Sequence, residues 1–497
     1  MLKIRQIKYA KGSTSVQVYK IENRKRVILR HIGTARSEDE LKNLITLAND
    51  FIEKISKQLI LFKEDEVSNN VLNLKQTEFL GVYYTFFYDL VHKVFISTGF
   101  DKLRNPFLLD LVIMRMLEPG SKLRSVALIE EYFGIKYRRQ QYYESAPKWL
   151  TLKTKTESIA VNFAKSYYEF DYSLVFYDVT TLYFETFKSD DLRKNGFSKD
   201  NKSQQPQILI GLMVTKEGLP ISYDIFSGNT FEGHTFIPMI EKFKLRNQVS
   251  SFTVVADAAM ISTENSEALN KKGIHYIVGA RLGNTSTALL QEIDRTLPRQ
   301  DGKTIRLKTH SGDLICSFSS VRYRKDKYEM EKQLERAKQL IENPGKSKKL
   351  KFTKTSGEKL ELNQKLIEKT HKLLGVKGYY TNLPERIANN KTIIDRYREL
   401  YRVEQCFRIS KSDLQTRPIF HYKEEPIKLH VLICFIALFI SKHIELKTGG
   451  SIKSFIHECK KITDARLLNK ITNKEIKLRA KKNPVIMHIL AKLDLLT

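Results

Sequence analysis

The chain has 497 residues, a length that suggests two to four domains and ample core. Its hydrophobic content of 41% and aromatic content of 10% are ordinary for a globular protein. Its 85 Lys and Arg against 56 Asp and Glu give a formal net charge of +29, spread along the whole chain. A broadly basic folded protein most often faces a polyanion, so we expect a nucleic-acid partner. Ribosome association, an anionic membrane and simple solubility are the alternatives.

The cysteines and the apolar segments indicate in which cellular compartment the protein is expected. Cys316, Cys406, Cys434 and Cys459 lie far apart and form no CxxC pair, so we expect reduced, buried thiols, a cytoplasmic location and no zinc module. The first residues lack the apolar core of a signal peptide. The longest apolar run, 429–440, has twelve residues, too few to span a bilayer. We therefore expect a buried helix there and no membrane association.

Residues 1–65 are predicted to form a small unit. Two alternating segments, 15–21 and 24–33, indicate strands joined by a turn, and a helix follows from Ser37. Ser37 as N-cap with Glu40 three residues later forms a capping box. A basic β-hairpin followed by a helix is either a DNA-contacting module or a packing or oligomerisation appendage.

Residues 75–170 are predicted to be mostly helical and to form a DNA-binding domain. The segment 105–119 is apolar all round and should be a buried helix. Pro119 and Gly120 break it, and a second helix begins at the serine that follows. A short turn then leads to a basic aromatic segment with Arg138 and Arg139. This order indicates helix-turn-helix contact with DNA, although many helical pairs share it.

From residue 172 the pattern changes to that of an α/β fold. Residues 172–285 contain three strands, the second and third joined by a tight hairpin, then a helix, a strand, a helix and a further strand. This is the element order of an RNase H-like fold, for which we expect a mixed sheet with helices on both faces.

The rest of that domain is predicted to follow an interruption. Residues 286–375 read as an insertion subdomain with short strands, a charged helix and a lysine run at 346–359, which is either a solvated surface or a phosphate channel. Over 376–445 a strand at 377–383 returns to the sheet, followed by a helix at 391–413 and the apolar helix. Residues 446–497 are expected to be a helical, basic tail.

Three acids stand out in this part of the chain. Asp178 interrupts a buried strand, Asp257 ends another, and Glu404 lies on the later helix. A buried ionised carboxylate is costly unless a metal, a basic partner or a raised pKa neutralises it. Three such acids that converge can hold two divalent metals for in-line attack on a phosphodiester.

Each acid also has a purely structural explanation. Asp178 would be surface-facing or in a buried salt bridge, Asp257 a helix N-cap, and Glu404 an ion-pair partner of Arg408 four residues on. If the strand register differs, Asp224 or Glu232 would replace one of the three.

The helix around Glu404 has a polar stripe. Leu400 and Phe407 place the segment against the core. Tyr397 and Lys411 lie seven residues before and after Glu404, so on a regular helix the three share one face. Tyrosine, acid and lysine in line suit a metal and a phosphate backbone.

At this point the chain resembles the DDE transposases of bacterial insertion sequences, in the branch with a Y-x2-R-x3-E-x6-K signature. The signature falls on Tyr397, Leu400, Glu404 and Lys411, so leucine stands at the arginine position. The segments around Asp178 and Asp257, together with 218–236 and the stretch after Lys411, resemble the same family. The resemblance covers about 1–445, most strongly 172–445.

The resemblance implies an RNase H-like catalytic domain in which Asp178, Asp257 and Glu404 are catalytic and bind two Mg²⁺, with Mn²⁺ able to substitute. Asp178 would bridge both metals. One metal would activate water, or later the 3′-hydroxyl, and the other would stabilise the leaving oxygen. Hydrolysis would nick the ends of the element, and the freed 3′-hydroxyl would attack target DNA.

The resemblance also implies partners. These are the double-stranded DNA of the element ends and of the target, and a second copy of the chain in a homodimer, in a cytoplasmic, nucleoid-associated setting. The expected DNA-contacting residues are Tyr397, Arg408, Lys411, Arg138 and Arg139. The rival functions are an RNase H-like nuclease that cuts without joining, and a non-enzymatic, domesticated DNA-binding protein.

Some relatives form a DNA hairpin and flip a base onto an aromatic residue of the insertion. The single tryptophan, Trp149, lies outside the insertion, which leaves Tyr323 or Tyr328 for that role.

Overall fold

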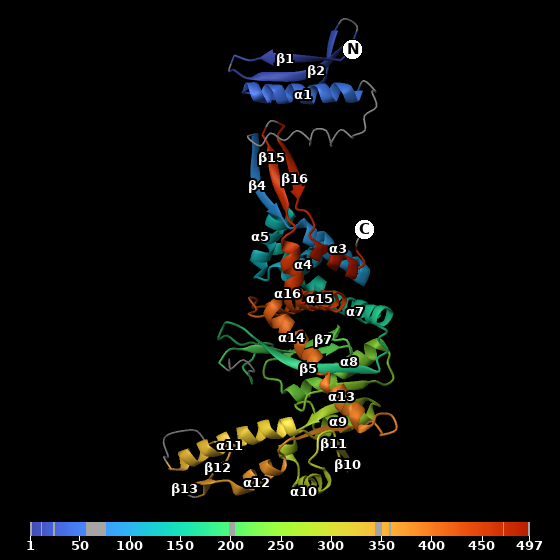
Figure 1. Ribbon diagram of the computed structural model, residues 1–497, viewed down its shortest axis with the longest axis vertical. Helices are drawn as coiled ribbons and strands as arrows, with labels where there is room; N and C mark the ends of the chain where they lie inside the picture. The colour runs from blue at the N-terminus through green and yellow to red at the C-terminus, as the bar shows by residue number, and fades with distance from the viewer. Residues whose placement is uncertain are drawn as a thin grey trace. The chain divides into compact units, whose positions relative to one another are not determined.

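The computed structural model (Figure 1) describes residues 2–10, 12–22, 25–55, 76–197, 204–342, 350–356, 359–470 and 472–495. The expected domain boundary near residue 65 and residues 346–349 of the lysine run lie outside the described residues. The chain divides into two compact units. The first comprises Met1–Lys93, Ala127–Lys136 and Lys453–Thr497, and the second comprises Val94–Val126 and Tyr137–Ile452.

The first unit opens with a three-stranded antiparallel sheet and a helix. The elements are β1 (Leu2–Lys8), β2 (Thr14–Glu22), β3 (Lys25–Ala35) and α1 (Glu38–Ile55), with the strands in sequence order. Val16 and Val18 of β2 pack against Leu44 and Ala48 of α1 to form a small apolar core. The two predicted strands and the helix are present. The strand β1 was not predicted; its exposed residues Lys3, Gln6 and Lys8 are separated by half-buried ones.

The C-terminal residues of this unit are not all helical, contrary to the prediction from the sequence. The tail expected to be helical contains α16 (Ile452–Lys460) and α17 (Pro484–Lys492), but β15 (Asp464–Asn469) and β16 (Lys474–Arg479) form a hairpin between them. Its third strand is β4 (Thr77–Tyr83), in a region also expected to be helical. The hydrogen bonds of this sheet join segments nearly the whole chain apart, which local sequence patterns cannot reveal.

Helices that the sequence predicted well fill the chain before the large sheet. They are α3 (Thr85–Thr98), η2 (Phe100–Leu103), α4 (Pro106–Leu117), α5 (Lys122–Phe133), α6 (Arg139–Leu150) and α7 (Leu152–Tyr168). The helix α4 begins after Asn105, whose side chain accepts a hydrogen bond from the Leu108 N–H at 3.2 Å. Every residue from Phe107 to Leu117 is buried, as its apolar pattern predicted.

The apolar run at 429–440 lies within a longer helix, α15 (Glu424–Thr448). Among the described residues it is the one helix long and apolar enough to cross a membrane, and 94% of its most apolar stretch is buried inside the protein. It packs against α4 and α6. The expected buried helix is therefore confirmed, and it is longer than the apolar run alone indicated.

The second unit is built on an eight-stranded mixed sheet with the order β10-β11-β14-β9-β8-β5-β6-β7. Its centre is formed by β5 (Leu174–Tyr183), β6 (Gln207–Val214), β7 (Pro220–Ser227), β8 (Thr253–Ala256) and β9 (His275–Ala280). The first three are antiparallel, whereas β8 runs parallel to β5 and β9 runs parallel to β8. Almost every residue of β5, β6 and β8 is buried, because helices cover both faces of the sheet.

The segment expected to interrupt this domain extends the same sheet. The strands β10 (Thr304–Thr309) and β11 (Gly312–Phe318) join it through β14 (Val376–Thr381), which is antiparallel to β9 and is the strand predicted at 377–383. The other elements of this segment are η3 (Leu282–Asn284), α10 (Thr287–Thr296), α11 (Ser320–Glu342), β12 (Thr353–Ser356), β13 (Lys359–Leu362) and α12 (Gln364–Lys372). The last four lie together at one end of the unit (Figure 1).

Two sets of helices flank the centre of the sheet (Figure 1). They are α8 (Glu232–Asn247) and α9 (Thr263–Lys271), and α13 (Asn390–Arg398), α14 (Tyr401–Arg408) and the π-helical turn η4 (Ile409–Asp413). The Tyr177 hydroxyl lies 2.7 Å from that of Thr235 on α8, while Thr180, on the other face of β5, lines a small cavity with Phe407 of α14. The predicted mixed sheet with helices on both faces is confirmed.

The single helix predicted over 391–413 is wrong. Between α13 and α14 the backbone hydrogen bonds tighten: the Leu400 N–H donates to the Tyr397 carbonyl, and the Val403 N–H to the Leu400 carbonyl. After Arg408 the chain widens into the π-helical turn. A tight turn followed by a wide one keeps the chain helical but shifts its faces, and turns of the second kind often occur at functional sites.

Candidate functional site

The register of two neighbouring strands brings Asp178 and Asp257 together. The parallel pairing of β5 and β8 ends with Tyr177 opposite Ala256; Asp178 is the next residue of β5, and Asp257 directly follows the end of β8. Their backbones are therefore about one strand spacing apart, ~4.8 Å. Asp178 is half-buried and Asp257 is exposed. The acids thus share the edge of an α/β sheet where ligands usually bind.

The side chain of Asp178 belongs to the face of β5 that α14 covers. Side chains alternate along a strand, so Asp178 shares its face with Thr180. Thr180 lines a cavity with Phe407, and Glu404 is one helical turn before Phe407. Phe407 therefore places α14 beside this face of β5, and Glu404 is an exposed residue one turn before Phe407.

Tyr397 links Asp257 to α13, the helix that precedes α14. Its hydroxyl donates a hydrogen bond to Asp257 Oδ1 at 3.3 Å, and its ring lies 4.9 Å from that of Tyr379, centroid to centroid. Burial raises the pKa of Tyr397, and the charges of Asp257 and then Glu404 raise it further. Tyr397 is thus a buried, neutral hydrogen-bond donor close to two of the three acids.

Lys377 on β14 is a site residue that the sequence analysis missed. Its ammonium lies 4.8 Å from the ring centroid of Tyr397 and 5.5 Å from that of Tyr379. Burial and then the Arg322 charge lower the pKa of Lys377, while the charges of Asp257 and Glu404 act in the opposite direction. The available signal was a lysine inside an otherwise apolar strand.

The charge of Glu404 raises the pKa of Tyr397 and also that of Lys377. Both are close enough to Asp257 and to Glu404 to be affected by each charge. Asp257, directly after β8, and Glu404, on α14, therefore both lie near Tyr397 and Lys377, and Asp178 is the neighbour of Asp257 by strand register.

Two of the structural explanations for these acids are wrong. The N-cap of α9 is Ser262, whose side chain accepts the Asn265 N–H, so Asp257 caps no helix there. Glu404 and Arg408 form no ion pair within 4.0 Å in the described part of the chain. Asp178 accepts the Val179 N–H at 2.7 Å.

The spare acids are less well placed. Asp224 is on β7, two strands from Asp178, and is in an ion pair with Lys242. Glu232 is the first residue of α8, the helix on the opposite face from α14. Both nevertheless lie near Tyr177, whose pKa is raised first by burial and further by the charges of Asp178, Asp224 and Glu232.

The predicted DNA-contacting residues are distributed over separate places. Arg408 is exposed at the end of α14, and Lys411 is half-buried in the π-helical turn. Arg138 and Arg139 are both exposed at the N-terminus of α6. The predicted stripe of Tyr397, Glu404 and Lys411 spans three helical pieces, so the regular spacing assumed for it is absent. Tyr397 is buried and Glu404 is exposed.

The aromatic candidates of the insertion differ in environment. Tyr323 and Tyr328 are both on α11. Tyr323 packs against the apolar residues beside β11, and Tyr328 is 64% exposed. Trp149 is buried on α6 against Phe107.

Carboxylates such as these are ligands for divalent metals. Within the described ranges, no group of three or more His, Cys, Asp or Glu side chains is close enough to hold one ion. Mg²⁺, however, keeps several waters and is commonly bound through one or two carboxylates plus substrate phosphates. Asp178 and Asp257, which follow paired residues of two neighbouring strands, are the two-carboxylate pair that fits this mode of binding.

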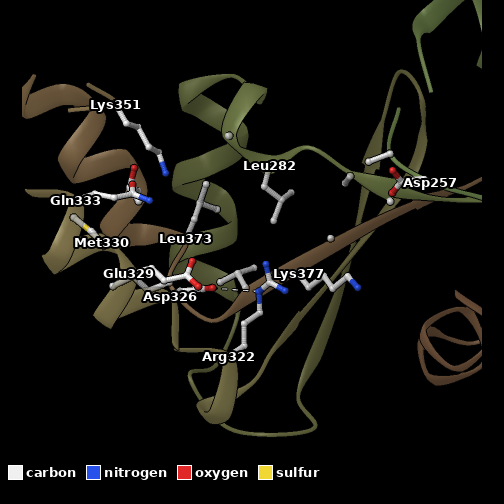
Figure 2. Close-up of a pocket in the computed structure, with 18 of the residues that line it drawn as sticks. Asp257, Leu282, Arg322, Asp326, Glu329, Met330, Gln333, Lys351, Leu373 and Lys377 are labelled. Carbon is white, nitrogen blue, oxygen red and sulfur yellow. Dashed lines mark ion pairs between the residues drawn. The ribbon is translucent and has the colours of Figure 1, made fainter. Parts of the chain in front are cut away.

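A hollow of about 480 Å³ opens beside Asp257. It extends between β9, β14 and α11, and its polar lining includes Arg322, Lys351, Lys377 and Tyr397. Figure 2 shows Arg322 paired with Asp326 in this hollow, with Lys377 in the same view between them and Asp257. Lys351 is the part of the predicted lysine run that contributes to it.

Comparison with known proteins gives a family. The model of the family described as "Transposase DDE domain" matches residues 169–440, just over half of the chain. No curated protein matches. A similar solved structure is the cryo-EM structure of the piggyBac transposase synaptic complex with hairpin DNA, with 13% sequence identity and a TM-score of 0.32. The alignment covers 58% of this chain and 51% of that one.

Proposed function

Because the chain belongs to the family of transposases that carry a DDE domain, we propose that it cuts DNA at the ends of its own mobile element and joins the freed 3′ ends to target DNA. The observation that carries the proposal is the β5–β8 register, which sets Asp178 beside Asp257. A third acid, Glu404 on α14, is proposed to complete the group, and support comes from Tyr397 and Lys377, which are affected by the charges of both Asp257 and Glu404. Carboxylates grouped at a sheet edge in a basic protein suit the chemistry of phosphodiesters.

The sheet supports an RNase H-like assignment for the catalytic domain. Its central order is β7-β6-β5-β8-β9, with an antiparallel meander followed by two parallel strands. In this arrangement the first acid lies within the first strand and the second ends the fourth strand. Both therefore reach the same edge, where a helix from later in the chain adds the third.

Two divalent ions, Mg²⁺ or Mn²⁺, are proposed to fit these acids. Asp178 and Asp257 would hold one, and Asp178 and Glu404 the other. When bound, such ions activate the attacking water or 3′-hydroxyl and stabilise the leaving oxygen. Tyr397 fixes the Asp257 carboxylate through the 3.3 Å hydrogen bond, and Lys377 brings a positive charge to the same place.

The branch of the family is part of the proposal. Tyr397, Glu404 and Lys411 fit the signature of bacterial insertion-sequence transposases, and Tyr397 contacts Asp257 directly. Leucine replaces arginine at position 400 and is buried. Arg398, Arg402 or Arg408 would supply the missing charge, and of these Arg398 lines the same hollow as Lys377.

The proposed partners are the terminal inverted repeats of the element and target DNA. The net charge of +29 favours a polyanion. Arg408 is the last residue of α14, which carries Glu404, and Lys411 lies in the π-helical turn that follows. Arg138 and Arg139 are exposed and basic at the start of α6. Bringing two DNA ends together favours a two-fold assembly, so we propose a homodimer on DNA.

The test is cleavage and joining of DNA that carries the native flanks of this gene, with Mg²⁺ or Mn²⁺. Asp178→Asn, Asp257→Asn and Glu404→Gln should each slow nicking at the flank ends by at least about 100-fold, since metal stabilisation of the transition state amounts to several kcal/mol. DNA binding should persist in all three variants. Asp224→Asn, a matched acid on the same sheet, should cut normally.

Each other result has a distinct meaning. If the wild type nicks the DNA but forms no joined products, the protein is a nuclease without strand-transfer activity. Binding without nicking would leave a non-enzymatic DNA-binding protein. Nicking that survives Asp178→Asn would show that the acids have been assigned wrongly.

A further inference from the structure

Two hollows meet at a pair of cations beside the acids. The first is the hollow of about 480 Å³ that Asp257 lines. The second, of about 560 Å³, lies between α13 and the face of β10, β11 and β14. Arg322 and Lys377 line both hollows. Both volumes are in the range of ligand clefts, and the shared residues place the two cations at the junction.

The second hollow is mainly basic. Besides the two shared cations it is lined by Lys391 and Arg398 of α13 and by a single acid, Asp395. Arg398 is 3.2 Å from Asp395, an ion pair within one helical turn. The other cations, Arg322, Lys377 and Lys391, give this hollow a net positive charge that attracts an anion.

Lys377 is held at the junction by its neighbours. Its ammonium lies over the rings of Tyr397 and Tyr379, which come from α13 and β14. Stacking on aromatic faces restricts a lysine that would otherwise move freely. Burial is the main cause of the lowered pKa of Lys377, and the nearby Arg322 charge lowers it further.

Arg322 approaches the junction from the insertion. It is on α11, and its Nε lies 3.2 Å from Asp326 Oδ2 one turn along that helix. This pair uses one edge of a guanidinium that has five N–H donors. Arg322 can therefore contact a phosphate oxygen while Asp326 fixes its orientation.

We propose that Arg322 and Lys377 bind one backbone phosphate of a DNA strand that runs from the acids through the first hollow into the second. The inference rests on the proposed function and identifies how its substrate strand is held. The two hollows would take the nucleotides on either side of that phosphate. Lys377 is then a positioning residue, because it fixes the strand next to the group that reacts.

The experiment replaces single phosphates by neutral methylphosphonates. A duplex with the native flanks carries one such substitution at a time near the cleavage point, and binding is measured with Ca²⁺ in place of Mg²⁺. At one position the wild type should bind about tenfold more weakly, the cost of a lost charged hydrogen bond. Lys377→Gln should bind unmodified DNA about tenfold more weakly and be insensitive to the substitution at that position.

Matched variants separate charge from folding. Lys377→Arg should retain the sensitivity, and Arg322→Gln should lose it. Lys365→Gln, which removes a charge from an exposed position on α12 outside both hollows, should behave as wild type. Thermal unfolding of each variant checks that the fold is intact.

The outcomes are distinguishable. A wild type that cuts DNA but is insensitive at every position would overturn the phosphate contact and leave the transposase proposal standing. The same conclusion follows if Lys377→Gln keeps the full sensitivity. A wild type that neither binds nor cuts this DNA would overturn the proposed function and, with it, this inference.

Discussion

At the residue scale, the site depends on a position where no side chain fits. A Cβ on Gly279 of β9 would come within 2.6 Å of the Tyr397 hydroxyl oxygen and 3.1 Å of the Ala258 Cβ. The absence of a side chain at 279 lets Tyr397 reach Asp257. The glycine is required by this close approach, since its backbone is outside the positive-φ region.

We predict that Gly279→Ala lowers the free energy of unfolding by about 1–3 kcal/mol, because the added methyl overpacks the site. It should also slow DNA cleavage more than it weakens DNA binding. Adding Tyr397→Phe removes the atom in the closest contact and should restore part of the stability but not the cleavage. Urea denaturation and nicking assays on the two single variants and the double variant measure both effects. A double variant as unstable as Gly279→Ala alone would disprove this steric explanation.

At the element scale, the ends of helices were the most predictable features. Ser37 precedes α1, and its hydroxyl accepts the Glu40 N–H at 3.2 Å. The Glu40 carboxylate accepts the Arg36 N–H at 2.5 Å, one residue earlier than the standard capping box requires. Both contacts are local in sequence, which is why the residue types alone revealed the helix start.

The cap gives a prediction for the N-terminal part of the first unit. Ser37→Ala should lower the free energy of opening α1 by about 1 kcal/mol, because an N–H at the helix start loses its partner. Hydrogen exchange of the α1 amides in the whole chain measures this. Thr46→Ala, which removes a hydroxyl bonded to Lys42 within the same helix, is the control and should cost less. Equal losses for the two variants would mean that Ser37 has no capping role.

The broken helix 390–413 illustrates the limit at this scale. Its apolar pattern predicted one helix, and the residues remain helical throughout. The tight turn at Leu400 and the wide turn after Arg408 arise where the helix packs across β5 and β6. No local signal marks these changes of pitch, because they are imposed by the sheet beneath.

At the scale of the whole molecule, burial of the long helix α15 keeps its histidines neutral. His443 is buried, and its Nδ1 lies 2.9 Å from the Tyr168 hydroxyl. Burial and then the Lys447 charge lower the pKa of His443 to about 4. Burial also lowers the pKa of His430, whose Nε2–H donates to the Thr416 carbonyl at 2.9 Å.

These groups make stability depend on pH. Below pH 6.5 the unfolded chain protonates its histidines, whereas folded His443 stays neutral down to about pH 4. The unfolded state therefore binds more protons in this window, and the free energy of unfolding should fall as the pH falls from 6.5 to 4. His443→Gln should make this fall shallower by about one proton. His488→Gln, at an exposed position on α17, should leave it unchanged. Urea denaturation at several pH values tests this, and identical slopes for wild type and His443→Gln would contradict it.

The sequence by itself determined the elements whose signals are local. The buried α4 and α15, the cap at Ser37 and the strands of Asp178 and Asp257 follow from apolar period and cap residues over a few turns. The motifs around Asp178, Asp257 and Glu404 also indicated the family that the comparison found. All of this information lies within short stretches of chain.

Tertiary structure decided what depends on long-range pairing. The hairpin at Asp464–Arg479 becomes a three-stranded sheet by pairing with β4, which lies about 400 residues earlier in the chain. Lys377 becomes a site residue because β14 adds to β9 and two tyrosine rings close around its ammonium. A lysine on an apolar strand has no fixed partner in sequence; packing selects its neighbours, and those neighbours set its charge and position beside Asp257.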